Sequence, residues 1–157
     1  MYSTAYLGLG SNLGDKRRNI ESAIAKVAER VGSIHAFSGF YETAPWGYDS
    51  KVNYLNVAIA VSTKLSPEEL LTITQTIEIN LGRHRKTING EYHDRLIDID
   101  ILLYNGLIIN TTNLTIPHPL MHQRTFVLQP LTEIAPQVIH PVLKMSITTL
   151  YYNLISI

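Results

Sequence analysis

The chain has 157 residues, of which 45% are hydrophobic and 17% charged, with thirteen Lys and Arg, thirteen Asp and Glu, and no cysteine. A single domain of this length buries roughly 70% of its unfolded surface, so it needs no disulfide or structural metal. The lack of cysteine excludes a disulfide-rich secreted fold and a thiolate zinc site. The zero formal charge and the absence of an apolar run near ~20 residues predict no nucleic-acid or membrane partner. We expect one soluble cytoplasmic domain over residues 1–157, acting as a monomer.

The beginning of the chain predicts a strand, a turn and a helix. Residues 4–9 are apolar and β-prone, and they lead into a turn over residues 8–15 that contains three glycines. From Ile20 onward, apolar residues recur at offsets 0, 3, 4, 7 and 11, which places them on one face of a helix ending at Gly32.

Two further strands and a second helix follow in the prediction. Residues 34–41 and 54–62 are β-prone, and the segment 43–50 between them is too long for a tight hairpin. We interpret this segment as a candidate functional loop. Ser66-Pro67-Glu68-Glu69 supplies an N-cap, a first-turn proline and a capping-box glutamate, and Gly82 ends the helix.

The second half of the chain predicts one long strand and little other regular structure. Residues 96–104 alternate in their first half, and Asn105-Gly106 predicts a hairpin turn into 107–109. The remainder contains five prolines and predicts short turns with one or two small helices, including 147–154. The resulting β-α-β-β-α-β order favours an α+β ferredoxin-like sandwich, with a mostly antiparallel sheet, helices packed on one face and flexible active-site loops on the other.

Asp98 and Asp100 form an acidic pair in the last long strand. They are two residues apart, so they share one face of a strand while the isoleucines beside them occupy the other. At about 7 Å the two carboxylates repel by roughly 2 kcal/mol at an effective dielectric of about 20. A cation reverses that cost, and Mg²⁺ with one or two carboxylates and substrate phosphates is usual in phosphoryl transfer. The alternative is a solvated face with Arg95 as counter-ion.

Positive charge gathers just before the acidic pair. A cation at 4 Å from a phosphate gains around 4 kcal/mol at the same dielectric, before desolvation is subtracted. For this segment alone a solvated basic loop is the simpler interpretation, but beside two carboxylates metal and arginines can share the charge of a transferring phosphoryl group. The basic residues are Arg83, His84, Arg85, Lys86, His93 and Arg95.

Several familiar catalytic motifs are missing. The chain has no Walker A sequence, and Gly8, Gly10 and Gly14 miss the Gly-x-Gly-x-x-Gly spacing by one residue. We therefore interpret Gly10-Ser11-Asn12 as a tight strand-to-helix turn rather than as a phosphate-binding loop. The lack of a cysteine nucleophile and of a Gly-x-Ser-x-Gly elbow argues against covalent catalysis.

Two aromatic residues are accompanied by polar groups. Tyr54 and Asn56 share a strand face, and Phe126 closely follows Arg124. A flat heterocycle could stack between Tyr54 and Phe126 while Asn56 recognises its edge. Ordinary core packing is the default for either aromatic taken singly, and Pro117-His118-Pro119 could merely shape a turn.

Six short motifs occur together along the chain. They are Gly10-Ser11-Asn12-Leu13-Gly14, Tyr54-Leu55-Asn56, Arg83-x-Arg85, Arg95-x-x-Asp98-x-Asp100-Ile101-Leu102, Pro117-His118 and Arg124-x-Phe126. In order and approximate spacing they resemble the 6-hydroxymethyl-7,8-dihydropterin pyrophosphokinase family, over residues 5 to about 142. The resemblance implies a ferredoxin-like fold and transfer of the β,γ-diphosphoryl unit of ATP to the hydroxymethyl oxygen of the pterin, giving AMP.

The resemblance also implies roles for individual residues. Asp98 and Asp100 would bind two Mg²⁺ ions, Arg83 and Arg95 would contact the phosphates, and Arg85 and Arg95 would lie on a lid over ATP. The implied pterin-binding residues are Thr43, Ala44, Trp46, Tyr54, Asn56 and Phe126. The implied ATP-binding residues are Gln75, Glu78, Arg85, Ile101, Leu114, Thr115, His118 and Arg124.

Two other functions remain open on the residues alone. One is a different two-metal enzyme of phosphoryl transfer, such as a phosphatase or nucleotidyltransferase, which product analysis would separate. The other is a ferredoxin-like binding module, for example one that binds RNA through aromatics on its sheet. Asp98 and Asp100 argue against the second, because they would repel RNA unless a metal were bound.

Overall fold

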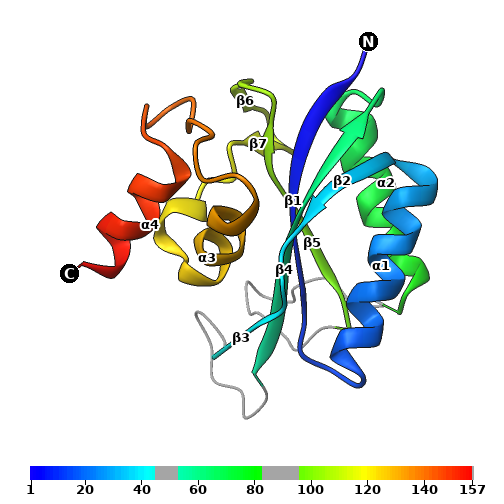
Figure 1. The fold of residues 1–157 in the computed structure, drawn as a ribbon. Coiled ribbons are helices and arrows are strands. Elements are labelled where there is room, and N and C mark those ends of the chain that lie inside the picture. Colours follow the sequence, from blue (N-terminus) through cyan, green and yellow to red (C-terminus); the bar gives the residue numbers. More distant parts are fainter. Residues whose placement is uncertain (45–52, 83–95, 157) are drawn as a thin grey trace.

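The computed structural model describes residues 1–44, 53–82 and 96–156. It contains one main sheet with helices on both of its sides (Figure 1). The elements in chain order are β1 (Ser3–Ser11), α1 (Lys16–Arg30), β2 (Gly32–Phe37), β3 (Tyr41–Thr43), β4 (Tyr54–Thr63), α2 (Pro67–Asn80), β5 (Asp98–Tyr104), β6 (Ile109–Asn110), β7 (Thr115–Ile116), a short 3-10 helix (Met121–Gln123), α3 (Thr125–Ile134) and α4 (Ile147–Ile155).

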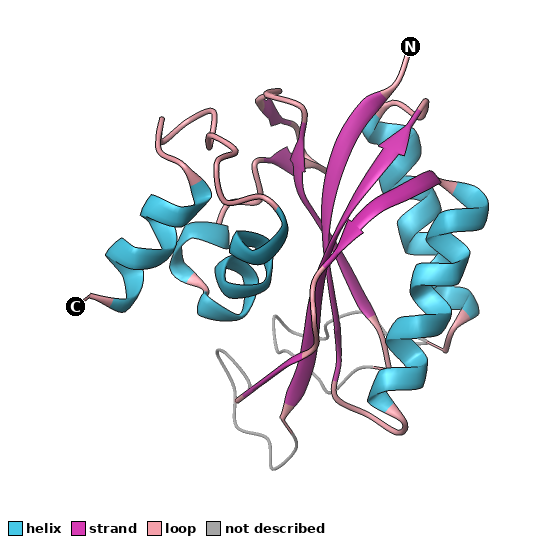
Figure 2. Cartoon of the chain, in the orientation of Figure 1, coloured by secondary structure: helices cyan, strands magenta, loops and turns pink. Residues whose placement is uncertain are grey.

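The four long strands of the sheet are ordered β2-β4-β1-β5, and all neighbours are antiparallel. β3 pairs with the first residues of β4, on the same edge as β2. The predicted strand over 34–41 is thus two strands, β2 and β3, separated by residues 38–40. The predicted α+β class with an antiparallel sheet is confirmed, and Figure 2 shows these strands twisted past one another between the helices.

The two helices predicted in the N-terminal half of the chain, α1 and α2, are confirmed. Asp15 caps α1 by accepting a hydrogen bond from the Arg18 backbone N–H, and Ile20, Ala23 and Val27 are its buried face. Ser66 and Glu69 form the reciprocal capping box of α2, which satisfies two backbone N–H groups that a helix start leaves open. In the described part of the chain no helix is long and apolar enough to cross a membrane.

Helices cover both faces of the sheet: α1 and α2 pack on one face, and α3 packs on the other with α4 outside it. Leu7 of β1 and Ile59 of β4 point toward α1 and α2, whereas Ala58 and Leu102 point toward the opposite face, where they join Leu128 of α3. The prediction that helices pack on one face is therefore wrong. The apolar side of α3 is buried against that second face. Pro130 lies inside α3, and a proline within a segment made this helix hard to predict from the sequence.

The predicted hairpin after β5 is also wrong. Asn105 does make a turn, at a φ of 49°, and its backbone N–H donates to the Thr4 carbonyl at 2.8 Å while its side-chain oxygen accepts from the Thr4 N–H at 2.8 Å. These bonds close the end of the β1–β5 ladder. The next strand, β6, pairs with β7 instead, and on β5 the Leu102 carbonyl accepts a hydrogen bond from the His118 backbone N–H at 3.0 Å.

A substitution at Gly32, where β2 begins, tests the pairing of β2 with β4. A Cβ atom there would lie 1.9 Å from the Ser62 carbonyl oxygen, so Gly32→Ala forces β2 away from β4. We expect a loss of at least about 2 kcal/mol in the free energy of unfolding, measured with urea. Gly106→Ala is the matched control, because a Cβ there meets nothing within 4 Å. Equal unfolding midpoints for the two variants would contradict this strand pairing.

Candidate active site

A cavity opens on the α3 side of the sheet, above β1, β4 and β5. It measures about 690 Å³ including the part open to solvent, a size suited to a small-molecule ligand. Residues of β1, β4 and β5, of the end of β3 and of the start of α3 form its walls. The lining residues are Gly8, Leu9, Gly10, Thr43, Ala44, Tyr54, Asn56, Val57, Ala58, Asp98, Asp100, Arg124, Phe126 and Val127.

The register of β1 explains where the acidic pair lies. In the antiparallel ladder between β1 and β5, Gly10 lies opposite Asp98 and Gly8 lies opposite Asp100. Both carboxylate residues line the one cavity, which confirms that they share a face. Because glycine has no side chain, β1 leaves the floor beside them open.

The two glycines were missed as site residues by sequence reasoning. The predicted turn over residues 8–15 is wrong for its first part, since Gly8, Gly10 and Ser11 belong to β1. A usable signal was present, because glycines two residues apart in a strand clear a single face.

Asn56 forms a fixed polar wall of the cavity. Its side chain is 5% exposed, and its Nδ2 donates to the Thr43 Oγ1 at 2.8 Å and to the Tyr41 carbonyl at 3.5 Å. Its Oδ1 lies toward β1, only 3.0 Å from where a Cβ of Gly10 would stand. Asn56 therefore presents an oriented amide next to the open floor.

The predicted aromatic pair also lies at the cavity. Tyr54 comes from the first residue of β4 and Phe126 from the first turn of α3, and both line the cavity. The Arg124 guanidinium carbon is 5.5 Å from the centroid of the Phe126 ring, within reach of a cation–π interaction. The structure thus brings two aromatic rings and a cation to one site.

His118 lies in the electrostatic field of the same site. Burial and, to a smaller extent, the positive charge of Arg124 lower the pKa of His118 to about 4, against the opposing effect of Asp98. The His118 Nδ1 accepts a hydrogen bond from the Leu120 backbone N–H at 3.2 Å. The neutral ring therefore carries its proton on Nε2, which makes that atom a hydrogen-bond donor without a full charge.

Other predicted ATP-binding residues lie away from the cavity lining. Ile101 and Leu114 belong to the core on the α1–α2 side, and Glu78 of α2 is 4% exposed and accepts a hydrogen bond from the Ile99 backbone N–H at 2.8 Å. Gln75 is exposed on α2, and Thr115 is in β7. Their roles stay predictions. Trp46, Arg83, Arg85 and Arg95 lie outside the described residues.

The acidic pair fits the predicted magnesium in its donor chemistry. Over residues 1–44, 53–82 and 96–156 no group of three or more His, Asp or Glu side chains could enclose a metal ion. Asp98 and Asp100 offer two carboxylates on one wall of an open cavity. That suits Mg²⁺, which is usually bound by one or two carboxylates while water and substrate phosphates supply the other ligands.

The antiparallel α+β fold places two carboxylates, a cation and two aromatic rings at one cavity, a combination suited in its chemistry to a flat ring and an anionic group. Residues 6–136 match the family 7,8-dihydro-6-hydroxymethylpterin-pyrophosphokinase. The 2-amino-4-hydroxy-6-hydroxymethyldihydropteridine pyrophosphokinase of Porphyromonas gingivalis is 47% identical over 137 residues, which cover 87% of this chain and 92% of that protein. The Bacillus subtilis protein of the same name is 43% identical, over 88% of this chain and 81% of that protein. The chain belongs to this pyrophosphokinase family.

Some relatives are much longer than this chain. Folic acid synthesis protein FOL1 of Dictyostelium discoideum is 46% identical over 149 residues, which cover 95% of this chain and 22% of that protein. The crystal structure of Plasmodium falciparum HPPK-DHPS with pteroate superposes with a TM-score of 0.80, over 99% of this chain and 43% of that chain, at 19% identity. That likeness shows the fold, and this chain spans less than half of either protein.

The lowered pKa of His118 predicts how stability depends on pH. In the folded protein the ring stays neutral down to about pH 4, whereas the unfolded ring takes up a proton near its ordinary pKa of 6.5. Between those values the unfolded chain binds more protons, so stability falls as the pH is lowered through this window and this contribution levels off below it. Urea unfolding of ligand-free protein measures the slope, which should be smaller in His118→Gln. An NMR titration that places the His118 midpoint near 6.5 would contradict the assignment.

Proposed function

We propose that the cavity on the α3 side of the sheet is where this chain carries out its family's reaction. The chain is an ATP-dependent pyrophosphokinase of folate biosynthesis, which transfers pyrophosphate from ATP to 6-hydroxymethyl-7,8-dihydropterin and gives AMP and the pterin diphosphate. One observation carries the choice of site: Asp98 and Asp100 open onto the same cavity as the aromatic pair and the fixed Asn56 amide.

The pterin would occupy the aromatic part of the cavity. Its flat ring would stack between Tyr54 and Phe126, and Asn56 with Thr43 would form hydrogen bonds along its amide and amino edge. Ala44 and Trp46 would contribute through the chain that follows β3. The support is the Asn56–Thr43 hydrogen bond of 2.8 Å, which orients the amide before any ligand arrives.

ATP would lie with its phosphates near Asp98 and its base beyond β5. His118 and Arg124 would contact the phosphates from the cavity side, together with Arg83, Arg85 and Arg95. Because β5 is the edge strand of the sheet, a nucleotide can cross it and reach residues of both faces. We assign the base and ribose side to Gln75, Glu78, Ile101, Leu114 and Thr115.

The chemistry then rests on positioning and electrostatics. Asp98 and Asp100 would hold two Mg²⁺ ions, and bound magnesium neutralises charge on the transferred diphosphoryl group. The neutral His118 would donate a hydrogen bond from Nε2 to a phosphate oxygen, and the buried Arg124 would add positive charge beside it. Tyr54, Asn56 and Phe126 would hold the hydroxymethyl group toward these residues, where its hydroxyl would lose a proton to solvent with the help of bound magnesium, so that no protein general base is required.

The finer description of the fold is part of this proposal. A ferredoxin-like sandwich is supported by the strand order β2-β4-β1-β5 with one helix before β2 and one before β5. A single monomeric domain over residues 1–157 in the cytoplasm remains our working description of the protein.

The product assay tests the proposed function directly. The chain is incubated with ATP, Mg²⁺ and 6-hydroxymethyl-7,8-dihydropterin, and the products are separated by chromatography. We expect AMP and pterin diphosphate in equal amounts, formed only when the pterin is present. ADP, free phosphate or turnover without pterin would instead favour another two-metal enzyme.

Removing one carboxylate should abolish most of the turnover. Asp98→Asn and Asp100→Asn keep the side-chain shape but lose the charge that holds magnesium, and we expect turnover to fall by at least about 100-fold. The free energy of unfolding should stay within about 1 kcal/mol of the parent. Asp15→Asn is the matched control, because asparagine caps α1 equally well. Near-normal turnover of either site variant at saturating Mg²⁺ would refute the metal role.

Truncating the aromatic wall should affect one substrate only. Phe126→Ala removes a stacking surface, so calorimetry with a non-hydrolysable ATP analogue present should show pterin affinity reduced by about tenfold. Affinity for the ATP analogue should change by less than about twofold. The control is Phe37→Ala, since Phe37 is 70% exposed and is not among the cavity-lining residues. Equal losses for both ligands would count against a stacking role.

A further inference from the structure

A latch joins the end of α3 to the turn before β3, and it lies outside the residues assigned so far. One oxygen of Glu133, Oε1, accepts hydrogen bonds from the Gly39 backbone N–H at 3.1 Å and from the Tyr41 hydroxyl at 2.5 Å. The other oxygen, Oε2, accepts from the same Gly39 N–H at 3.2 Å. The carboxylate therefore connects segments more than ninety residues apart in the sequence.

The α3 side of the latch leads to the aromatic wall. Glu133 is the next-to-last residue of α3, and Phe126 is in the first turn of the same helix, about two turns away. Holding Glu133 therefore fixes the direction of the helix that presents Phe126 to the cavity.

The β3 side of the latch leads to the polar wall. Tyr41 stands opposite Asn56 in the β3–β4 ladder, and its carbonyl oxygen accepts from the Asn56 Nδ2 at 3.5 Å. Two residues further on, Thr43 accepts from the same nitrogen at 2.8 Å. Alternation along β3 puts Tyr41 and Thr43 on one face, so one carboxylate is two contacts away from the amide that faces the ligand.

The opposite face of β3 is held by α1. The Lys16 Nζ is 3.8 Å from the Glu42 Oε1 and donates to the Asn53 carbonyl at 3.1 Å. The Arg17 guanidinium carbon lies 4.7 Å from the centroid of the Phe40 ring. These contacts connect β3 and its flanking residues to α1, whereas Glu133 connects β3 to α3.

We propose that Glu133 is a positioning residue for pterin recognition, which sets the gap between the Phe126 wall and the Asn56–Thr43 wall by holding Tyr41 and Gly39. This inference rests on the proposed function, because it assumes that the pterin occupies this cavity. Hydrogen bonds to a carboxylate are short and strong, and the bond to Glu133 also raises the pKa of Tyr41. A flat ring bound between two walls is sensitive to small changes in their separation.

The test measures the affinity for each substrate separately in variants of the latch. Glu133→Ala should weaken pterin binding by about tenfold, and Tyr41→Phe, which removes only the hydroxyl, by about threefold to fivefold. Glu133→Gln should lie between Glu133→Ala and the parent, because an amide oxygen still accepts one hydrogen bond. Affinity for a non-hydrolysable ATP analogue should stay within about twofold in all three. The double variant Glu133→Ala/Tyr41→Phe should bind pterin as Glu133→Ala does, because the two residues act through one contact.

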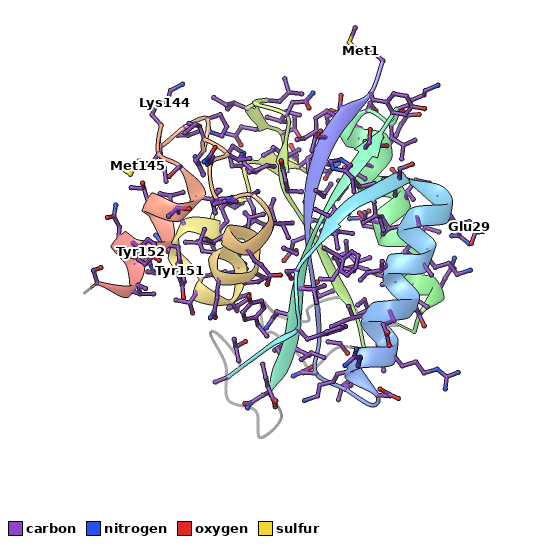
Figure 3. All side chains as sticks on the ribbon, in the orientation of Figure 1. Met1, Glu29, Lys144, Met145, Tyr151 and Tyr152 are labelled. Carbon is purple, nitrogen blue, oxygen red and sulfur yellow. The ribbon has the colours of Figure 1, made fainter. Side chains whose placement is uncertain are left out.

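Matched controls come from the same residue types elsewhere. Glu29 of α1 and Tyr152 of α4 lie on opposite outer sides of the molecule (Figure 3), and both are exposed and are not among the cavity-lining residues. Glu29→Gln and Tyr152→Phe should leave both affinities unchanged. Thermal unfolding of every variant shows whether a loss of affinity accompanies a loss of folded protein, and Tyr41→Phe serves as the milder variant if Glu133→Ala unfolds early.

The outcomes separate the two proposals. If Phe126→Ala weakens pterin binding but Glu133→Ala and Tyr41→Phe do not, the cavity assignment stands and the positioning role is wrong. If the latch variants weaken both ligands equally, Glu133 has only a general structural role. If the parent binds no pterin, the proposed function and this inference both fail.

Discussion

The site depends on how β1 pairs with its two neighbours in the middle of the sheet. Antiparallel pairing places Gly8 between Asp100 and Ala58, and Gly10 between Asp98 and Asn56. Because side chains alternate along each strand, these residues face the same side, while Leu7 and Leu9 are buried against α1 and α2. A shift of one residue in the β1–β5 ladder would turn the acids into the core, and the same shift in the β1–β4 ladder would turn Asn56 away from the cavity, so core packing and site geometry are enforced by the same registers.

The helices on the second face give the cavity its other wall. α3 packs on β4 and contributes Phe126 and Val127, and α4 packs on α3 from outside. Charged groups are concentrated where this wall meets the edge strand, and Asp98 and Arg124 act in opposite directions on the pKa of His118. The cavity thus combines aromatic side chains with charged groups, a combination that suits transfer of a diphosphoryl group to a heterocyclic alcohol.

Local patterns predicted the parts of this arrangement that depend on period and capping. The spacing of Asp98 and Asp100 gave their common face, and Ser66 with Glu69 gave the start of α2. Contacts between segments that are distant in the sequence could not be predicted from such local patterns. The turn at Asn105 has good hairpin chemistry, yet β1 takes the neighbouring position in the sheet, and Pro130 lies inside α3 because tertiary packing outweighs its usual effect on helices. The Glu133–Tyr41 contact joins distant segments, which no local pattern encodes.

The most direct test is a crystal structure of the chain with Mg²⁺, a non-hydrolysable ATP analogue and 6-hydroxymethyl-7,8-dihydropterin. The account predicts the pterin ring between Tyr54 and Phe126, its hydroxymethyl group directed toward the phosphates, and magnesium coordinated by Asp98 and Asp100. A pterin bound elsewhere, or magnesium and phosphates placed away from these two carboxylates, would contradict it.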